Sequence, residues 1–275
     1  MSDFASRFAE LKQELDDPDA LFFGADMRDE LLELADDIPD QASEAWLYRE
    51  LAVLEGKRSV IECLDHADRA LAAHEATNAL PKDRLYFMHL ICGDVGTAWD
   101  GGPRTTKHLE RALELHAELG QPVEAAFKIR MNQGVCGWSA ESPRLGLEWF
   151  EPLLADAQAF YGEQSRDLSH LLWLMSRSEE ALGNIPAALK YGKRSLDLVD
   201  DRADKGRRVS ASVTHAALLL KAGKKREAKQ LLEEAIAFAD AHCSNATQTF
   251  AREERNRLLP PERSIADRLK GLFRS

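Results

Sequence analysis

Apolar residues recur every three or four positions along most of this chain, the spacing that places them on one face of an α-helix. Phe4, Phe8 and Leu11, for example, share one face of a helix predicted over residues 2–16. Alanine, leucine, glutamate and arginine, which all favour helix, dominate the composition, and only 16 Gly and 10 Pro argue against a turn-rich all-β chain. The pattern therefore predicts an all-α protein.

A longer period is superimposed on the helical one. Five aligned sites lie 40 to 42 residues apart, at Leu51, Gly93, Gly134, Ser176 and Ala216. Twelve residues after these sites stand Cys63, Thr105, Gly146, Ala188 and Ala228, and nineteen residues after them stand Ala70, Ala112, Leu153, Ser195 and Ala235. All but the two leucines are Gly, Ala, Ser, Cys or Thr. Because antiparallel helices cross closely only where side chains are small, this period predicts repeated helical hairpins.

Turn-forming residues follow the same period. Pro103, Pro143 and Pro186 fall where the second helix of a hairpin is predicted to begin, and proline's missing N–H is tolerated there. Glycines that can end the first helix in a left-handed conformation lie in or near the same connections, at Gly56, Gly101, Gly102, Gly183 and Gly223. Two unrelated residue types thus mark the same hairpin boundaries.

The two clearest units cover residues 182–198 and 221–237, which carry Gly183 with Ala188 and Gly223 with Ala228 at matching places. At these residues the chain resembles a tetratricopeptide repeat (TPR) protein with longer helices than the common repeat of about 34 residues. The resemblance covers roughly residues 44–240. It implies a right-handed α-solenoid of helical hairpins that binds other proteins.

The repeat frame divides the chain into three parts. Residues 1–43 are expected to form an acidic, degenerate N-terminal hairpin, residues 44–240 five TPR-like hairpins, and residues 241–275 basic C-terminal capping helices. The capping helices are predicted at 246–258 and through Ile265, Leu269 and Leu272.

In a stack of hairpins the first helices usually line the concave side, so their outward positions decide what binds there. Three residues before each aligned site stand Tyr48, Leu90, Met131, Trp173 and Val213, and all five are apolar or aromatic. Charged, aromatic or imidazole side chains at neighbouring offsets complete a candidate partner-binding groove with Phe87, Lys128, His170 and Arg177. If exposed, these residues would bind an amphipathic helix or an extended peptide. The alternative is that the stripe packs between neighbouring hairpins.

Charge is distributed unevenly along the chain. The formal net charge is −11, yet residues 1–50 carry 4 basic and 15 acidic side chains, while residues 201–275 carry 16 basic and 10 acidic ones. Such polarity suits self-association through the acidic head and the basic tail, and it also suits helix faces that merely contact solvent. Nucleic acid is not expected as a partner, because no aromatic residues are interleaved in the basic runs at 202–208 and 221–229.

The sequence contains no recognisable catalytic or cofactor motif. The string at residues 132–139 is similar to the papain-type nucleophile region, but the second cysteine before the aromatic residue is missing and Cys136 matches the non-catalytic position. His89 and Cys92 share a helix face but have no companions at metal-ligand spacing, so neither a metal nor another cofactor is expected.

The location follows from what the chain contains. No apolar run approaches the roughly 20 residues that span a bilayer, and the N-terminus lacks the features of a secretory signal. The four cysteines lie far apart, as is typical of reduced thiols. We expect a cytoplasmic, non-enzymatic protein-interaction scaffold or adaptor. The alternative is a regulator in which a peptide or small effector changes the shape of the solenoid and thereby its affinity for a second protein.

Overall fold

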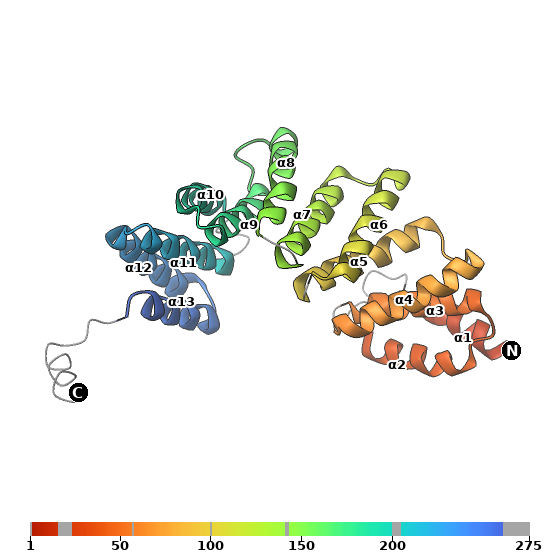
Figure 1. Ribbon diagram of the computed structural model, residues 1–275. Helices are drawn as coiled ribbons and strands as arrows, with labels where there is room; N and C mark the ends of the chain where they lie inside the picture. The colour runs from red at the N-terminus through yellow and green to blue at the C-terminus, as the bar shows by residue number, and fades with distance from the viewer. Residues whose placement is uncertain are drawn as a thin grey trace, which may run out of the picture. The chain divides into compact units, whose positions relative to one another are not determined.

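The computed structural model describes residues 2–15, 24–56, 58–99, 101–140, 143–199 and 205–260 (Figure 1). Every regular element in these ranges is helical. The chain forms two compact units, residues 1–149 and 150–275, and their boundary falls within α8 (Pro143–Tyr161).

The first unit contains α1 (Ser2–Leu15), α2 (Gly24–Leu34), the 3-10 turn η2 (Ala35–Asp37), α3 (Gln41–Glu55), α4 (Val60–Thr77), α5 (Lys82–Trp99), α6 (Pro103–Leu119) and α7 (Val123–Ala140). The second contains α9 (Leu168–Ala181), α10 (Ile185–Leu198), α11 (Lys205–Lys221), α12 (Lys225–His242) and α13 (Asn245–Leu258). In the described ranges, no helix is both long enough and apolar enough to cross a membrane.

Consecutive helices pair as the period predicts, and small residues lie at the contacts. A Cβ added to Gly93 in α5 would lie only 2.9 Å from Leu109 Cγ in α6, so glycine permits this close crossing. In the next unit Ser176 of α9 and Ala188 of α10, two aligned sites twelve residues apart, meet directly: the Ser176 hydroxyl donates to the Ala188 carbonyl oxygen over 2.8 Å. The prediction of an all-α repeat of helical hairpins is confirmed.

The turn residues also lie where the sequence places them. Pro103, Pro143 and Pro186 occupy the first or second position of α6, α8 and α10. Gly183 and Gly223 have φ of 78° and 76°, the left-handed conformation expected at the end of a first helix. Gly56 is different, because its φ of −54° is right-handed and the prediction of a left-handed residue there is wrong.

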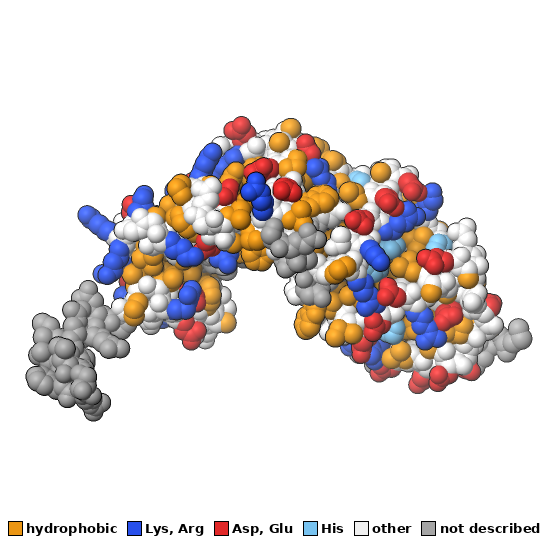
Figure 2. All heavy atoms as spheres, viewed as in Figure 1, with side chains coloured by type: hydrophobic (Ala, Val, Ile, Leu, Met, Phe, Trp, Pro, Cys, Tyr) orange, Lys and Arg blue, Asp and Glu red, His pale blue; other side chains and the backbone are white. Residues whose placement is uncertain are grey.

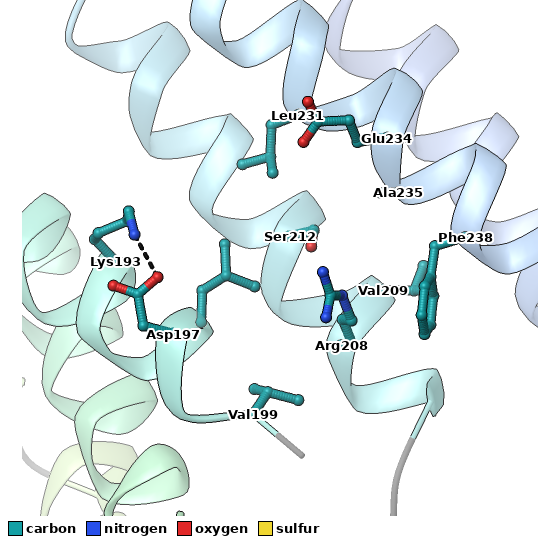
Figure 3. A pocket seen from close by; sticks show the side chains of 11 residues that line it. Lys193, Asp197, Val199, Arg208, Val209, Ser212, Leu231, Glu234, Ala235 and Phe238 are labelled. Atoms are coloured by element: carbon teal, nitrogen blue, oxygen red, sulfur yellow. Dashed lines mark hydrogen bonds and ion pairs between the residues drawn. The ribbon is translucent and has the colours of Figure 1, made fainter. Parts of the chain in front are cut away.

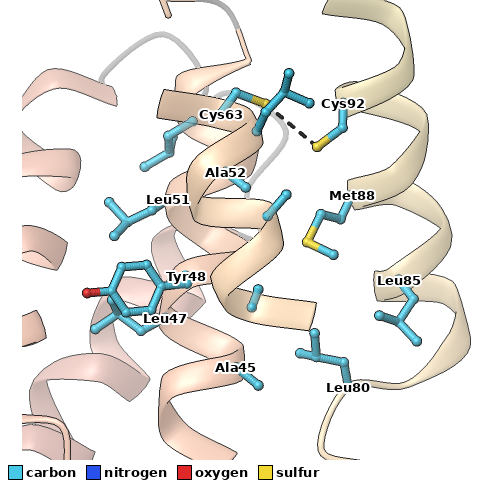
Figure 4. Packing of buried hydrophobic residues seen from close by; sticks show 14 of the residues in the cluster. Ala45, Leu47, Tyr48, Leu51, Ala52, Cys63, Leu80, Leu85, Met88 and Cys92 are labelled. Carbon is cyan, nitrogen blue, oxygen red and sulfur yellow. Dashed lines mark hydrogen bonds between the residues drawn. The ribbon is translucent and has the colours of Figure 1, made fainter. Parts of the chain in front are cut away.

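The core of the first unit is continuous from α1 to α7. Figure 4 shows the part of it that lies among α3, α4 and α5. Leu51 of α3 and Met88 of α5 are fully buried, and burial of one such side chain contributes about 1.5–3 kcal/mol. Cys63 of α4 and Cys92 of α5 are also buried, with their Sγ atoms 3.7 Å apart. Two thiols thus fill the space between neighbouring hairpins, where bulkier side chains would not fit.

Both ends of the described chain pack on their own unit. Phe4 of α1 is buried in the core of the first unit, and the Lys12 Nζ lies 3.4 Å from the centre of the Trp46 ring in α3. At the other end, Ala251 of α13 packs with Val209 and Ala239 of α11 and α12. The helix predicted through Ile265, Leu269 and Leu272 lies outside the described residues.

A pair of buried histidines joins α5 to α6. The Nδ1 atoms of His89 and His108 are 2.9 Å apart, so one ring must donate this proton and the other accept it. Burial lowers the pKa of His89 to about 3, with the neighbouring His108 ring as a second cause, and burial lowers the pKa of His108 to about 4. Both rings are therefore neutral at neutral pH, which the shared hydrogen bond requires.

This pair predicts that acid destabilises the protein. Each ring has a lower pKa in the folded protein than in the unfolded chain, so the unfolded state binds more protons below about pH 6.5. The free energy of unfolding therefore falls as the pH falls below this value, by up to about 1.4 kcal/mol per pH unit for each ring. Urea unfolding at about pH 7 and about pH 5.5 measures this slope, to which other buried histidines contribute. The variant His89→Leu should have a shallower slope than the wild type. Equal slopes would show that this pair does not couple folding to protonation.

Candidate functional site

The structure sorts the predicted groove residues by exposure. Phe87 is 42% exposed, and Lys128 and Arg177 are exposed as well. Four others are partly exposed: Leu90, Met131, His170 and Trp173. These seven remain candidates for contact with a partner.

The prediction that Tyr48 and Val213 line an exposed groove is wrong, because each side chain is only 5% exposed. The Arg69 guanidinium of α4 lies 4.0 Å from the centre of the Tyr48 ring, so the second helix of the same hairpin covers this side chain. Val213 belongs to the core between α11 and α12, where it clusters with Leu232. Both side chains are buried within their own hairpins, whereas the alternative interpretation placed the stripe between neighbouring hairpins.

In the first unit Lys128, a charged residue of the predicted groove, is paired within the protein. Asp94 of α5 accepts hydrogen bonds from Lys128 and from the Asn132 side chain of α7, the latter over 2.7 Å. Phe87 lies beside the Arg49 guanidinium, 5.6 Å from the ring centre. Lys128 is therefore less available to a ligand than its exposure indicates.

In the second unit, two predicted residues line one cavity. His170 and Trp173 of α9 have ring centres 5.7 Å apart and contribute to a pocket of about 260 Å³. We call it the α9–α11 pocket; it is lined by Ser169, His170, Trp173, Ser195, Val199, Gly206, Arg207, Ser210 and Ala211. Part of the candidate groove is therefore a real concavity.

A second concavity lies on the other side of α11 (Figure 3). This α10–α12 cavity has a volume of about 470 Å³ and is lined by Lys193, Leu196, Asp197, Val199, Arg208, Val209, Ser212, Leu231, Glu234, Ala235 and Phe238. The Arg208 guanidinium lies 4.9 Å from the centre of the Phe238 ring, and Lys193 pairs with Asp197 along α10. The charged residues that line this cavity include both cations and anions.

Helix α10 is shorter than α12. In the repeat frame Ile185 aligns with Lys225, and Leu198 with Phe238, yet α12 continues one turn further, to His242. The 14-residue α10 ends because Val199 takes an extended conformation. Val199 lines both cavities.

The lining of the α9–α11 pocket is less polar than its residue types indicate. The hydroxyls of Ser169 and Ser195 each donate to the other residue's carbonyl oxygen, over 3.0 and 2.7 Å, so both donors are satisfied within the protein. Burial, and then the positive charge of Arg207, lower the pKa of His170 to about 4, and the ring is neutral at neutral pH. Among the described residues that line this pocket, Arg207 is the charged one.

Helix α11 supplies an unusual charge pattern. Its 17 residues include Lys205, Arg207, Arg208 and Lys221 and no acidic residue. On the face drawn in Figure 2, lysine and arginine side chains gather over α10 to α13. Arg207 lines the α9–α11 pocket and Arg208 lines the α10–α12 cavity, so these adjacent arginines face different cavities.

Sequence reasoning missed the α10–α12 cavity and the part of α10 that lines both sites. One feature of the sequence near these sites is the absence of acidic residues from 205–221. Other candidates found no support among the described residues. No group of three or more metal-ligating side chains converges there, and Cys136 is buried, with its Sγ 3.5 Å from the Thr97 hydroxyl.

The proximity of Arg207 to His170 gives a direct spectroscopic prediction. In an NMR titration His170 should become protonated near pH 4 in the wild type. The variant Arg207→Ser should raise the pKa of His170 part of the way toward its usual range, because the repulsive charge is lost while burial remains. Arg208→Ser, which removes the same charge from the other face, should change this pKa less. A wild-type midpoint near the usual value of about 6.5 would contradict the buried geometry.

No protein-family model matches this sequence, and no curated protein matches it either. Solved structures do match. The BtubC (BKLC) protein from P. vanneervenii has a TM-score of 0.59 and 16% identity, over 84% of this chain and 91% of that chain.

The quorum sensor NprR from B. thuringiensis, in its apo form, has a TM-score of 0.68 and 16% identity, over 93% of this chain and 76% of that chain. NprR in complex with its cognate peptide NprX has a TM-score of 0.59 and 16% identity, over 94% of this chain and 74% of that chain. A signal-transduction ATPase with a tetratricopeptide repeat sensor, from Pyrococcus horikoshii, has a TM-score of 0.58 and 13% identity, over 96% of this chain and 46% of that chain. At these identities the similarity establishes the fold, and this chain has a TPR-like helical-repeat fold.

Proposed function

We propose that this protein is a non-catalytic peptide-binding module, a scaffold or adaptor that holds a partner peptide or helix against α9 and α11. The observation that carries this proposal is the α9–α11 pocket, where Trp173 and His170 form one wall and Val199 and Ala211 add apolar surface. Tryptophan in a partly enclosed pocket is a frequent source of binding energy in protein interfaces.

The size of the pocket supports a single side chain as its occupant. Sites for whole drug-sized ligands are about 300–1,000 Å³, and this pocket, at about 260 Å³, is smaller. An apolar side chain that projects from a longer peptide would fit such a space, while the rest of the peptide lies on the exposed surfaces of the two helices. The complex of NprR with its cognate peptide supports peptide binding on this fold.

We also propose a cytoplasmic location. Cys63 and Cys92 are free thiols although their sulfur atoms lie only 3.7 Å apart. Such an arrangement suits a reducing compartment, where disulfides seldom form.

Replacement of Trp173 tests the binding site. Phage-displayed random dodecapeptides should be selected on the full chain, and the selected peptides measured by fluorescence anisotropy against Trp173→Ala and Trp99→Ala. Trp99 is 67% exposed in the first unit and serves as the matched control. We expect Trp173→Ala to weaken binding at least about tenfold, because a buried aromatic contact is lost, and Trp99→Ala to leave it unchanged. Selected peptides that bind both variants as they bind the wild type would refute the assignment.

A second candidate function is peptide-responsive regulation of a second interaction. One observation favours it: Val199, at the end of α10, lines both the α9–α11 pocket and the α10–α12 cavity. A peptide that moves this residue would alter the other cavity as well, and with it the affinity for a second protein.

Solution X-ray scattering distinguishes the regulator from the scaffold. A regulator should change its scattering profile when a selected peptide saturates the site, because the ligand favours one of two arrangements of the helices. The Trp173→Ala variant at the same peptide concentration provides the baseline. Profiles that overlay with and without every bound peptide would leave only the scaffold function.

A further inference from the structure

Two buried thiols from neighbouring hairpins face each other in the core of the first unit. The Sγ atoms of Cys63 in α4 and Cys92 in α5 lie 3.7 Å apart, and both side chains are fully buried (Figure 4). The S–S distance of a disulfide is about 2.05 Å, so the two sulfur atoms would have to approach by about 1.7 Å to form a bond. The other two cysteines lie elsewhere: Cys136 contacts the Thr97 hydroxyl, and Cys243 follows α12 in the second unit.

The backbone around the two thiols is closely packed. Cys63 occupies one of the aligned small-residue sites, and α4 packs on α5. Gly56, in the α3–α4 connection, lies against the residue next to Cys92, because a Cβ added to this glycine would overlap Ile91 Cγ2. A change of side-chain rotamer moves a sulfur atom over a distance comparable to the gap, so a bond can form without a large shift of either helix.

The two thiols differ in acidity. Cys63 lies in the first turn of α4, where the dipole of the helix stabilises a thiolate. The contact with Cys92 lowers the pKa of Cys63 because the Cys92 thiol donates to the Cys63 sulfur, and burial opposes this effect. The same hydrogen bond raises the pKa of Cys92, and burial raises it further. Cys63 is therefore the thiol that reacts first, and Cys92 is the resolving thiol beside it.

The start of α4 gives access to the thiols. Ile61 and Glu62, which directly precede Cys63, are exposed, and the ends of helices open more readily than their centres. A bulky oxidant such as glutathione disulfide would need a wide opening of the core, whereas hydrogen peroxide is little larger than water. A small peroxide is thus the class of oxidant that this burial admits, at a rate limited by the opening.

We infer that Cys63 and Cys92 form a reversible disulfide when hydrogen peroxide oxidises the protein, and that this bond joins the α3–α4 hairpin to the α5–α6 hairpin. The pair stays reduced in a reducing compartment until peroxide rises. The inference is independent of the proposed function, because the two thiols belong to the first unit and the α9–α11 pocket to the second.

The oxidation takes two steps. The Cys63 thiolate attacks one oxygen of the peroxide, the O–O bond breaks, hydroxide leaves, and Cys63 becomes a sulfenic acid. The Cys92 thiolate then attacks the Cys63 sulfur, the S–O bond breaks, and a second hydroxide leaves. The two protons lost by the thiols convert these hydroxides to water, so two thiols and one peroxide give one disulfide and two waters. A dithiol reductant reverses the reaction by thiol–disulfide exchange.

Peptide mapping of the full chain tests the bond. The folded protein is treated with limiting hydrogen peroxide, alkylated, and cleaved with trypsin without reduction. Trypsin releases Cys63 in the peptide 59–69 and Cys92 in the peptide 85–104. Mass spectrometry should find these two peptides joined, with two hydrogen atoms fewer than their sum, and dithiothreitol should separate them. Cys136, which is also buried, should remain alkylated.

The melting temperature provides a second readout. Oxidised wild-type protein should melt about 5–10 °C above the reduced protein, because the bond closes a loop in the unfolded chain. Cys63→Ala places at this site the residue that two other repeats carry there, Ala188 and Ala228, and should abolish the shift. Cys136→Ala removes a different buried thiol of the same unit and should keep the shift, which makes it the matched control.

Three results would overturn the inference. The first is oxidation of Cys63 to a sulfenic or sulfinic acid without the joined peptides. The second is linkage of Cys63 or Cys92 to Cys136 or Cys243 as often as to each other. The third is a melting shift that persists in Cys63→Ala. If this variant does not fold, the peptide maps of the wild type and of Cys136→Ala decide the question. None of these results bears on peptide binding at the α9–α11 pocket.

Discussion

The structure depends on the close approach of paired helices, which only small side chains allow. At Gly93 even a methyl group would press on Leu109, and at Ser176 the hydroxyl bonds directly to the backbone of the opposite helix. Each such crossing sets the distance between the two helices of a hairpin, and thereby the position of the next hairpin in the same unit. A larger residue at these sites would change the packing of several helices.

The two cavities of the second unit lie on different faces of α11. The α9–α11 pocket is lined by residues of α9, α10 and α11, and the α10–α12 cavity by residues of α10, α11 and α12. Val199, which ends α10 in an extended conformation, lines both of them. The candidate site is therefore assembled from consecutive helices of one unit, and no single helix forms it.

Burial and pairing decide which of the many charged groups are available to a ligand. The His89–His108 pair and His170 are neutral because they are buried, and Lys128, Asp94 and Glu180 are engaged in ion pairs within the protein. Of the described residues that line the α9–α11 pocket, Arg207 carries the charge.

The sequence by itself determined the repeat. Small residues and prolines at a fixed period follow from local sterics and backbone conformation, which act wherever two helices cross or a helix begins, so the hairpins could be predicted without coordinates. It also pointed to His170 and Trp173. Only the tertiary structure decided that Tyr48 and Val213 are covered, that Lys128 pairs with Asp94, and that Arg207 and Arg208 face different cavities. The exposure of a side chain and its charge partners depend on residues of other helices. A periodic pattern along one helix carries no information about those residues.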